Sequence, residues 1–193
     1  MRTSMLIFSI VFASGTLASA QTSWVLEQSD QMHGWTAPVP QLNVSLNHAF
    51  TEHVGAWGYA QIFTDHAQMY AGISAAPAPW LEFGIAVGME QPANSNLRFG
   101  SFLSLSQNGL GYVYGMYENG GSGPWYRVEF GLEVTPRFLF GGIIQSGQGI
   151  GPRFEIALPW IPVQLWGGPT FDWTDTTGKP WGAIFGIRAK FKH

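Results

Sequence analysis

The chain of 193 residues contains no cysteine and little charge. Without cysteine it has neither a disulfide framework nor the residue that anchors a lipoprotein. Charged residues make up 11% of the sequence, whereas they make up about 25% of ordinary soluble domains. The formal net charge of −3 excludes the basic surface expected of a nucleic-acid-binding protein. We therefore expect no nucleic-acid partner.

Long apolar runs are also scarce. The clearest one, residues 5–13, follows Arg2 and precedes Ala18-Ser19-Ala20, and it is too short to cross a bilayer comfortably as a helix. A basic residue, an apolar run and an A-x-A site in this order indicate a cleavable signal peptide. We expect a signal peptide over residues 1–20 and a single exported domain over residues 21–193.

Glycine and aromatic residues are abundant, and most of the domain alternates between apolar and less apolar positions. The last run is the clearest case, because one face of a strand there would be wholly apolar. That face holds Trp181, Ala183, Phe185, Ile187, Ala189 and Phe191, and the other holds Gly182, Ile184, Gly186, Arg188 and Lys190. Alternation of this kind, interrupted by Gly, Pro, Asn, Asp and Ser, predicts an all-β fold of repeated hairpins.

The pattern predicts about twelve strands, with ten also possible. We expect them near Trp24–Ser29, Gln41–Phe50, Val54–Phe63, Ala67–Ala75, Trp80–Glu90, Leu97–Ser106, Leu110–Glu118, Trp125–Val134, Arg137–Gln145, Arg153–Leu158, Val163–Trp173 and Trp181–Phe191. The connections alternate between compact turns and mostly longer loops, such as residues 30–40 and 146–152. An even number of strands places both ends of the domain on the rim with the compact turns.

A domain with few charges and no apolar helix can still contact lipid if a closed sheet exposes apolar side chains at every second position. Tryptophan clusters at the ends of the runs, as expected for aromatic girdles at the two membrane interfaces. The expected girdle residues are Trp24, Trp80 and Trp160 at one rim and Trp125, Trp173 and Trp181 at the other.

The segment Gly186-Ile187-Arg188-Ala189-Lys190-Phe191 resembles the C-terminal signal of bacterial outer-membrane β-barrel proteins, although Lys192 and His193 follow the aromatic residue and Ile184 stands where a polar residue is usual. The resemblance implies a single antiparallel up-and-down transmembrane β-barrel in the bacterial outer membrane. Its partners would be outer-membrane lipid and the barrel-assembly machinery. Gly186, Ala189 and Phe191 would form the barrel-insertion signal.

A soluble exported barrel or β-sandwich is the alternative, because it would alternate in the same way with its faces reversed. Local alternation does not separate the two folds. Low charge, aromatic girdles and unequal rims favour the membrane barrel.

In a membrane barrel the less apolar face surrounds the lumen. The charged residues expected there are Glu82, Glu90, Arg98, Arg127, Glu129, Glu133, Arg153, Glu155, Arg188 and Lys190. They could form ion pairs that close the barrel, or they could line a pore for small solutes in which the basic residues favour anions and the glutamates oppose them. Small inward residues favour an open passage, among them Gly84, Ala86, Gly88, Gly100, Gly131 and Gly186. The sequence does not decide between a porin-like channel and a closed structural or surface-interaction barrel.

An enzyme is a less favoured reading. Membrane-embedded lipid-modifying barrels need a nucleophile and a base on one face, but the odd spacing of Ser45 and His48 sends them to opposite faces. No Gly-x-Ser-x-Gly motif occurs. His48, Glu52 and His53 straddle a turn, where their side chains diverge rather than converge on a metal. We assign no catalytic, cofactor-binding or metal-binding residue.

Overall fold

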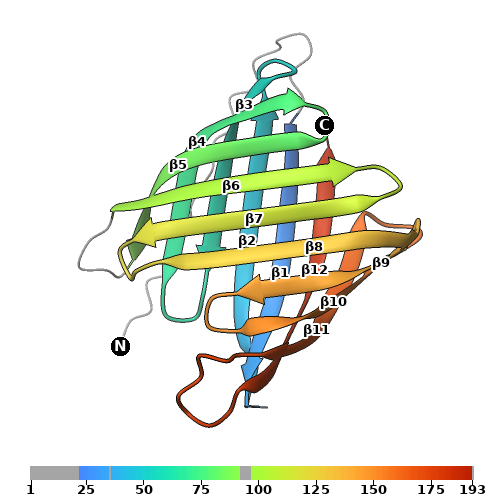
Figure 1. Ribbon diagram of the computed structural model, residues 1–193. Coiled ribbons are helices and arrows are strands. Elements are labelled where there is room, and N and C mark those ends of the chain that lie inside the picture. Colours follow the sequence, from blue (N-terminus) through green and yellow to red (C-terminus); the bar gives the residue numbers. More distant parts are fainter. Residues whose placement is uncertain (1–21, 35, 92–96, 193) are drawn as a thin grey trace.

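The computed structural model describes residues 22–34, 36–91 and 97–192, so the predicted signal peptide lies outside the described residues. Within these residues twelve strands form one closed antiparallel barrel (Figure 1). The strands are β1 Thr22–His33, β2 Val39–Ala49, β3 Val54–Ile62, β4 Ala67–Ala78, β5 Leu81–Gln91, β6 Leu97–Gln107, β7 Gly111–Gly120, β8 Trp125–Thr135, β9 Phe138–Gln145, β10 Gly149–Ala157, β11 Val163–Phe171 and β12 Trp181–Lys192. The predicted fold class and strand number are confirmed.

The barrel closes through antiparallel pairing of β1 with β12, from Ser23 opposite Lys192 to His33 opposite Gly182. β1 is longer at both ends than the predicted strand Trp24–Ser29, because it has a partner on each side and its polar residues need not end it. β12 continues one residue beyond Phe191. The N-terminal end of β1 and the C-terminal end of β12 therefore lie on the same rim, as predicted.

The two rims differ less than the sequence suggested. We call the rim that carries the β2–β3, β4–β5, β6–β7, β8–β9 and β10–β11 turns the turn rim, and the opposite one the loop rim. The predicted loops 30–40 and 146–152 are shorter than expected, because β1 continues to His33, β2 begins at Val39 and β10 begins at Gly149. The remaining difference comes mainly from the β11–β12 connection, residues 172–180.

That connection is held in place by aspartate side chains. Asp172 Oδ1 accepts hydrogen bonds from the backbone N–H and the hydroxyl of Thr174, at 2.9 and 2.6 Å. Asp175 does the same for Thr177 and also accepts from the Lys179 N–H. The hydrogen bond from the Thr177 hydroxyl, with those from backbone N–H groups, holds the pKa of Asp175 below its ordinary value. On the same rim, the hydrogen bond with His66 lowers the pKa of Asp65.

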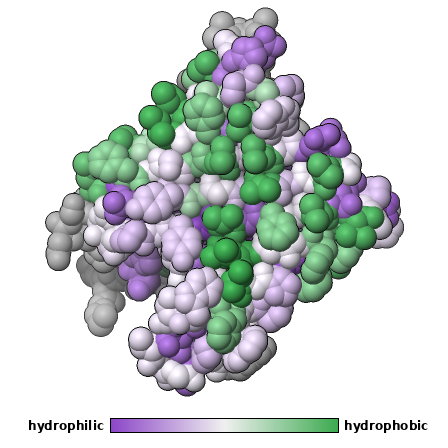
Figure 2. All heavy atoms as spheres, in the orientation of Figure 1, coloured by the Kyte–Doolittle hydropathy of each residue, from purple (hydrophilic) through white to green (hydrophobic). Residues whose placement is uncertain are grey.

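The outer face of the barrel is apolar and the inner face carries the charges, which excludes the soluble alternative. In β5, for example, Phe83, Ile85 and Val87 are 45%, 63% and 57% exposed. Hydrophobic side chains spread across the visible strands in Figure 2, while the strongly hydrophilic residues gather mostly near the ends. The described residues contain no helix that is long and apolar enough to cross a membrane.

Most of the predicted girdle tryptophans are exposed. These are Trp24, Trp80, Trp160, Trp173 and Trp181. The prediction was wrong for Trp125, which is partly buried and packs against the aromatic cluster inside the barrel. It shares the inner face with Arg127, two residues further along β8, because alternation along the strand decides its direction.

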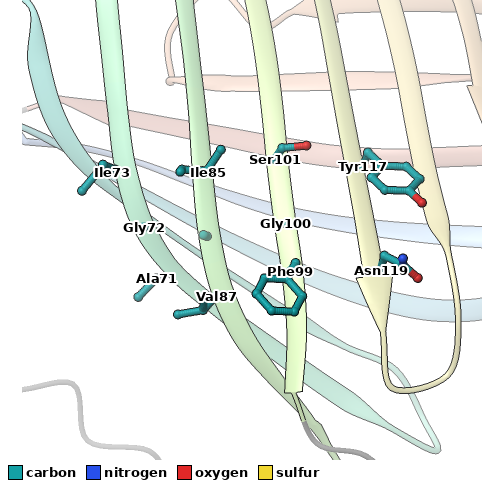
Figure 3. Close-up of a pocket in the computed structure, with 11 residues that line it drawn as sticks. Ala71, Gly72, Ile73, Ile85, Val87, Phe99, Gly100, Ser101, Tyr117 and Asn119 are labelled. Atoms are coloured by element: carbon teal, nitrogen blue, oxygen red, sulfur yellow. The ribbon is translucent and has the colours of Figure 1, made fainter.

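The apolar outer face has a depression of about 560 Å³ across β4, β5, β6 and β7 (Figure 3). Its lining includes Ile73, Ile85, Val87 and Phe99, with Tyr117 at one side. Ala71 and Ser101 leave room between these larger side chains. The depression belongs to the surface that faces lipid.

Small inward residues do not leave the lumen empty, contrary to the interpretation of the sequence, because aromatic rings cover several of the glycines. A Cβ atom added to Gly84 would lie 2.5 Å from Trp57 Nε1, and one added to Gly100 would lie 3.0 Å from the Tyr70 ring. Gly131 lies beneath Tyr112 and Gly186 beneath Trp166 in the same way. The missing side chain lets each ring lie flat against the barrel wall.

Gly84→Ala tests this packing. The added methyl group would press into the rigid rings of Trp57 and Phe102, so we expect a loss of about 1–3 kcal/mol in the free energy of unfolding. Urea unfolding of the protein in lipid vesicles measures the loss. Gly115→Ala on β7 is the matched control, because its Cβ would meet only a Val128 methyl group at 3.9 Å. Equal stability of the two variants would contradict the proposed packing.

Candidate functional site

The inner face of the barrel gathers the predicted charged residues into two groups. Six of them line a cavity that we call the vestibule: Glu82, Arg127, Glu129, Glu133, Arg188 and Lys190. The other four are Glu90, Arg98, Arg153 and Glu155, each no more than 2% exposed. The vestibule has a volume of about 590 Å³ and reaches the residues of the β6–β7 and β8–β9 turns, so it opens toward the turn rim, and it extends along β8 as far as Trp125.

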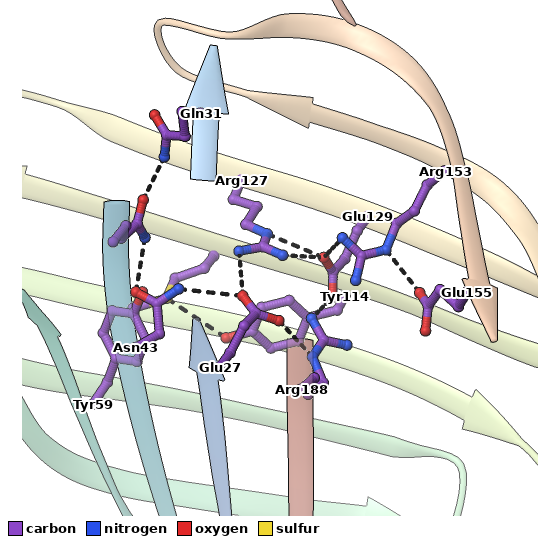
Figure 4. Close-up of polar contacts among 12 residues, drawn as sticks. Glu27, Gln31, Asn43, Tyr59, Tyr114, Arg127, Glu129, Arg153, Glu155 and Arg188 are labelled. Atoms are coloured by element: carbon purple, nitrogen blue, oxygen red, sulfur yellow. Dashed lines mark hydrogen bonds and ion pairs between the residues drawn. The ribbon is translucent and has the colours of Figure 1, made fainter. Parts of the chain in front are cut away.

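At the inner end of the vestibule, four side chains form a closed cycle of alternating charge, which we call the charge ring (Figure 4). Arg127 on β8 contacts Glu27 at 2.9 Å and Glu129 at 2.8 Å. Arg188 on β12 contacts the other oxygen of each carboxylate, Glu27 at 2.6 Å and Glu129 at 3.0 Å. Each charge of the ring thus has two partners of opposite sign, and the ring joins β1 and β12 to β8 across the lumen.

The charge ring continues into a second pair on β10. Arg153 lies 3.2 Å from Glu129 and 2.7 Å from Glu155, which also accepts a hydrogen bond from Tyr112. The Arg153 guanidinium lies 3.8 Å from the centre of the Trp166 ring, a cation–π contact. Three arginines therefore lie near the Trp166 indole in the middle of the lumen, and three glutamates balance their charge.

Amide side chains connect the charge ring to the loop rim. Asn43 donates a hydrogen bond to Glu27 at 3.2 Å and accepts one from Gln41 at 2.8 Å. Gln41 accepts one from Gln31, and Gln31 accepts one from Gln148 at 3.0 Å. Beside this chain, Ile143 and Ile184 pack against Trp166. Ile184, an unusual residue at this inward position of an outer-membrane strand, is accommodated by its packing against Trp166.

The lumen is consequently asymmetric along its axis. The vestibule is open toward the turn rim, whereas the half toward the loop rim is filled by side chains such as Ser29, Gln41 and Gln145, which are at most 2% exposed. The charge ring lies where the two halves meet. Any solute crossing the barrel would have to displace side chains at this point.

A second charged cluster, around Arg98, lies near the loop rim. Arg98 contacts Glu90 at 2.6 Å and Glu118 at 3.5 Å, and its Nε donates a hydrogen bond to the Tyr70 hydroxyl. The guanidinium also donates to the carbonyl oxygen of Gly120, the last residue of β7, and to that of Gly123 in the β7–β8 connection. The cluster therefore fastens this loop to the barrel wall.

The alternation pattern did not identify several residues of the site. Glu27 and Glu118 share a face with inward residues, but Glu27 falls on the least certain predicted strand and Glu118 at the end of another. Trp166 lies on an inner face within β11, where only the local alternation with Leu165 and Gly167 indicates its direction. The contacts among these residues join distant parts of the chain, so no local pattern could reveal them.

The structure also places the residues that were weighed for catalysis and metal binding. Ser45 lines the vestibule, whereas His48 Nδ1 lies 2.9 Å from the Thr22 hydroxyl, so the two are not neighbours in one site. The His53 ring lies 3.4 Å from the exposed Glu52 carboxylate. In the described part of the chain, no three His, Asp or Glu side chains come together as metal ligands would.

Arg98→Met tests the stabilising role of the second cluster. It would leave the buried carboxylates of Glu90 and Glu118 without their cation, so we expect a loss of about 3–5 kcal/mol in the free energy of unfolding. Lys190→Met is the matched control, since Lys190 is an exposed cation on the same inner face and should cost less than about 1 kcal/mol. Unfolding midpoints in urea compare them, and a small effect at Arg98 would be inconsistent with the assigned role.

No protein-family model matches the sequence, and no curated protein matches it either. Solved structures do match in fold. A KdgM porin has a TM-score of 0.56 at 8% identity over 86% of this chain and 99% of its own, and a KdgM porin in complex with disordered oligogalacturonate gives 0.57 at 8% over the same shares. The NanC porin gives 0.50 at 5% over 86% of this chain and 98% of its own. At these identities the likeness concerns the fold, and the chain has the architecture of an outer-membrane β-barrel.

Proposed function

We propose that this chain is a porin-like channel for small solutes in the bacterial outer membrane, with the charge ring as its constriction. The observation that carries the proposal is the vestibule of about 590 Å³, which opens toward the turn rim and is lined by all four members of the charge ring, Glu27, Arg127, Glu129 and Arg188. Such a cavity gives a solute access from one rim of the barrel to the charged side chains within it. The apolar outer face and the likeness to porin folds also support the proposal.

The constriction is built from side chains and not from backbone. Its four members are held by ion pairs, which can exchange for water or for a solute when they separate. Because both oxygens of Glu27 and of Glu129 are engaged, opening one contact leaves the other in place. We expect a narrow passage of low conductance. The buried charged residues Arg153 and Glu155, which adjoin the charge ring at Glu129, would border it.

The remaining parts of the proposal concern export and assembly. Residues 1–20 would direct export and be cleaved. Gly186, Ala189 and Phe191 would serve as the barrel-insertion signal read by the assembly machinery. Phe191 faces outward, with its ring 6.1 Å from that of Trp24, a position that is accessible from lipid. Outer-membrane lipid would then surround the apolar face. We propose no catalytic activity.

Single-channel recording of the refolded protein in planar bilayers tests the function. We expect discrete conductance steps from the natural sequence. The double variant Arg127→Ser and Glu129→Ser removes one charge of each sign and leaves the pairs Arg188–Glu27 and Arg153–Glu155 intact. Shorter side chains widen the constriction, so its conductance should rise at least about twofold.

The control for this experiment changes the same charges elsewhere. Glu52→Ser with Arg137→Ser removes one exposed charge of each sign in the β2–β3 and β8–β9 turns, away from the charge ring, and should leave the conductance steps unchanged. Heat-modifiable migration on gels verifies that every variant is folded. If the folded protein and the widened variant both fail to conduct, the barrel is closed and the proposal is wrong.

A further inference from the structure

We infer that the vestibule selects small cationic solutes, such as organic amines, over anionic ones, with Glu82 and Glu133 as the residues that determine this specificity. The inference rests on the proposed channel function and adds the charge class of the solute to it. The sequence left the charge preference undecided, because the basic residues would favour anions and the glutamates would oppose them. Three observations on the inner face support the inference.

The first observation is that the arginines are fully compensated. The side chains of Arg98, Arg127, Arg153 and Arg188 are between 1% and 11% exposed, and each contacts two carboxylates. Within the central cluster, three arginines face the three glutamates Glu27, Glu129 and Glu155. These guanidinium groups present little free positive charge to a solute in the vestibule.

The second observation is that two carboxylates of the vestibule have no such partner. Among the described residues, neither Glu82 nor Glu133 has a cation within ion-pair distance, although the Gly109 N–H donates to Glu133 at 3.2 Å. Lys190 is the one vestibule cation within the described ranges that makes no ion pair, so the vestibule holds two uncompensated carboxylates and one uncompensated ammonium group. The inner face as described holds seven glutamates and five basic residues. A cavity with low-dielectric walls concentrates the field of uncompensated charges, and the local cation concentration rises.

The third observation concerns the aromatic part of the lining. Tyr112, Tyr114 and Trp125 line the vestibule and are each only partly buried. The quadrupole of each neutral ring gives its faces a negative electrostatic potential, which attracts cations and not anions. Glu82 lies opposite Ser104, which in turn pairs with Tyr114, so a free carboxylate and a ring lie two strands apart on one wall.

Liposome swelling with solutes of similar size and different charge tests the inference. The probes are glucosamine, glucose and glucuronate, which are cationic, neutral and anionic at slightly acidic pH. With the natural sequence, glucosamine should enter at least about threefold faster than glucuronate. In the double variant Glu82→Gln and Glu133→Gln this preference should disappear, because Lys190 then holds the remaining free charge. Lys190→Gln should increase it.

Asp65→Asn, which removes a carboxylate at the loop rim, is the matched control and should retain the preference. Faster or equal entry of glucuronate through the natural barrel would overturn the inference while leaving the channel function intact. A preference that survives in the double variant would overturn the assignment to Glu82 and Glu133. If none of the three solutes enters through the folded barrel, the channel function fails and the inference fails with it.

Discussion

Pairing of the first strand with the last is the constraint on which the rest of this structure depends. A bilayer offers no hydrogen-bond partners to an exposed sheet edge, so β1 and β12 must satisfy each other. Closure also gives the sheet an inside and an outside. Each strand then sorts its side chains by position alone, with Phe83, Ile85 and Val87 directed to lipid and Glu82, Gly84 and Ala86 to the lumen.

Inside, the dominant requirement is that buried charges be compensated. Removing a guanidinium or a carboxylate from water costs several kcal/mol, and only close contacts of opposite sign offset that cost. The charge ring meets this requirement with four groups that share their partners, and Arg153 adds a cation–π contact with Trp166. Compensation of this kind explains how a narrow lumen holds so many charges and still leaves only a few of them available to a solute.

The sequence was sufficient to predict the architecture but not to predict the contacts within the site. Alternation is a local property, so the strands and the inward direction of Arg127 and Glu129 follow from neighbouring residues. The partner of a lumen charge is a non-local property, since Glu27 and Arg188 are 161 residues apart in the chain. The same limit applies to the glycines, whose space is filled by rings from other strands, such as Trp57 over Gly84. Trp125 was misplaced because its position at a strand end was given more weight than its alternation.

The membership of the charge ring has a consequence for the order of assembly. Glu27 comes from the first strand, Arg188 from the last, and Arg127 and Glu129 from a strand between them. A chain that lacks its final strand, or that has paired it in a shifted register, therefore holds two glutamates and one arginine without their fourth member. Correct closure is the event that completes and neutralises the charge ring, so the ring favours the native register of the β1–β12 pairing over neighbouring registers.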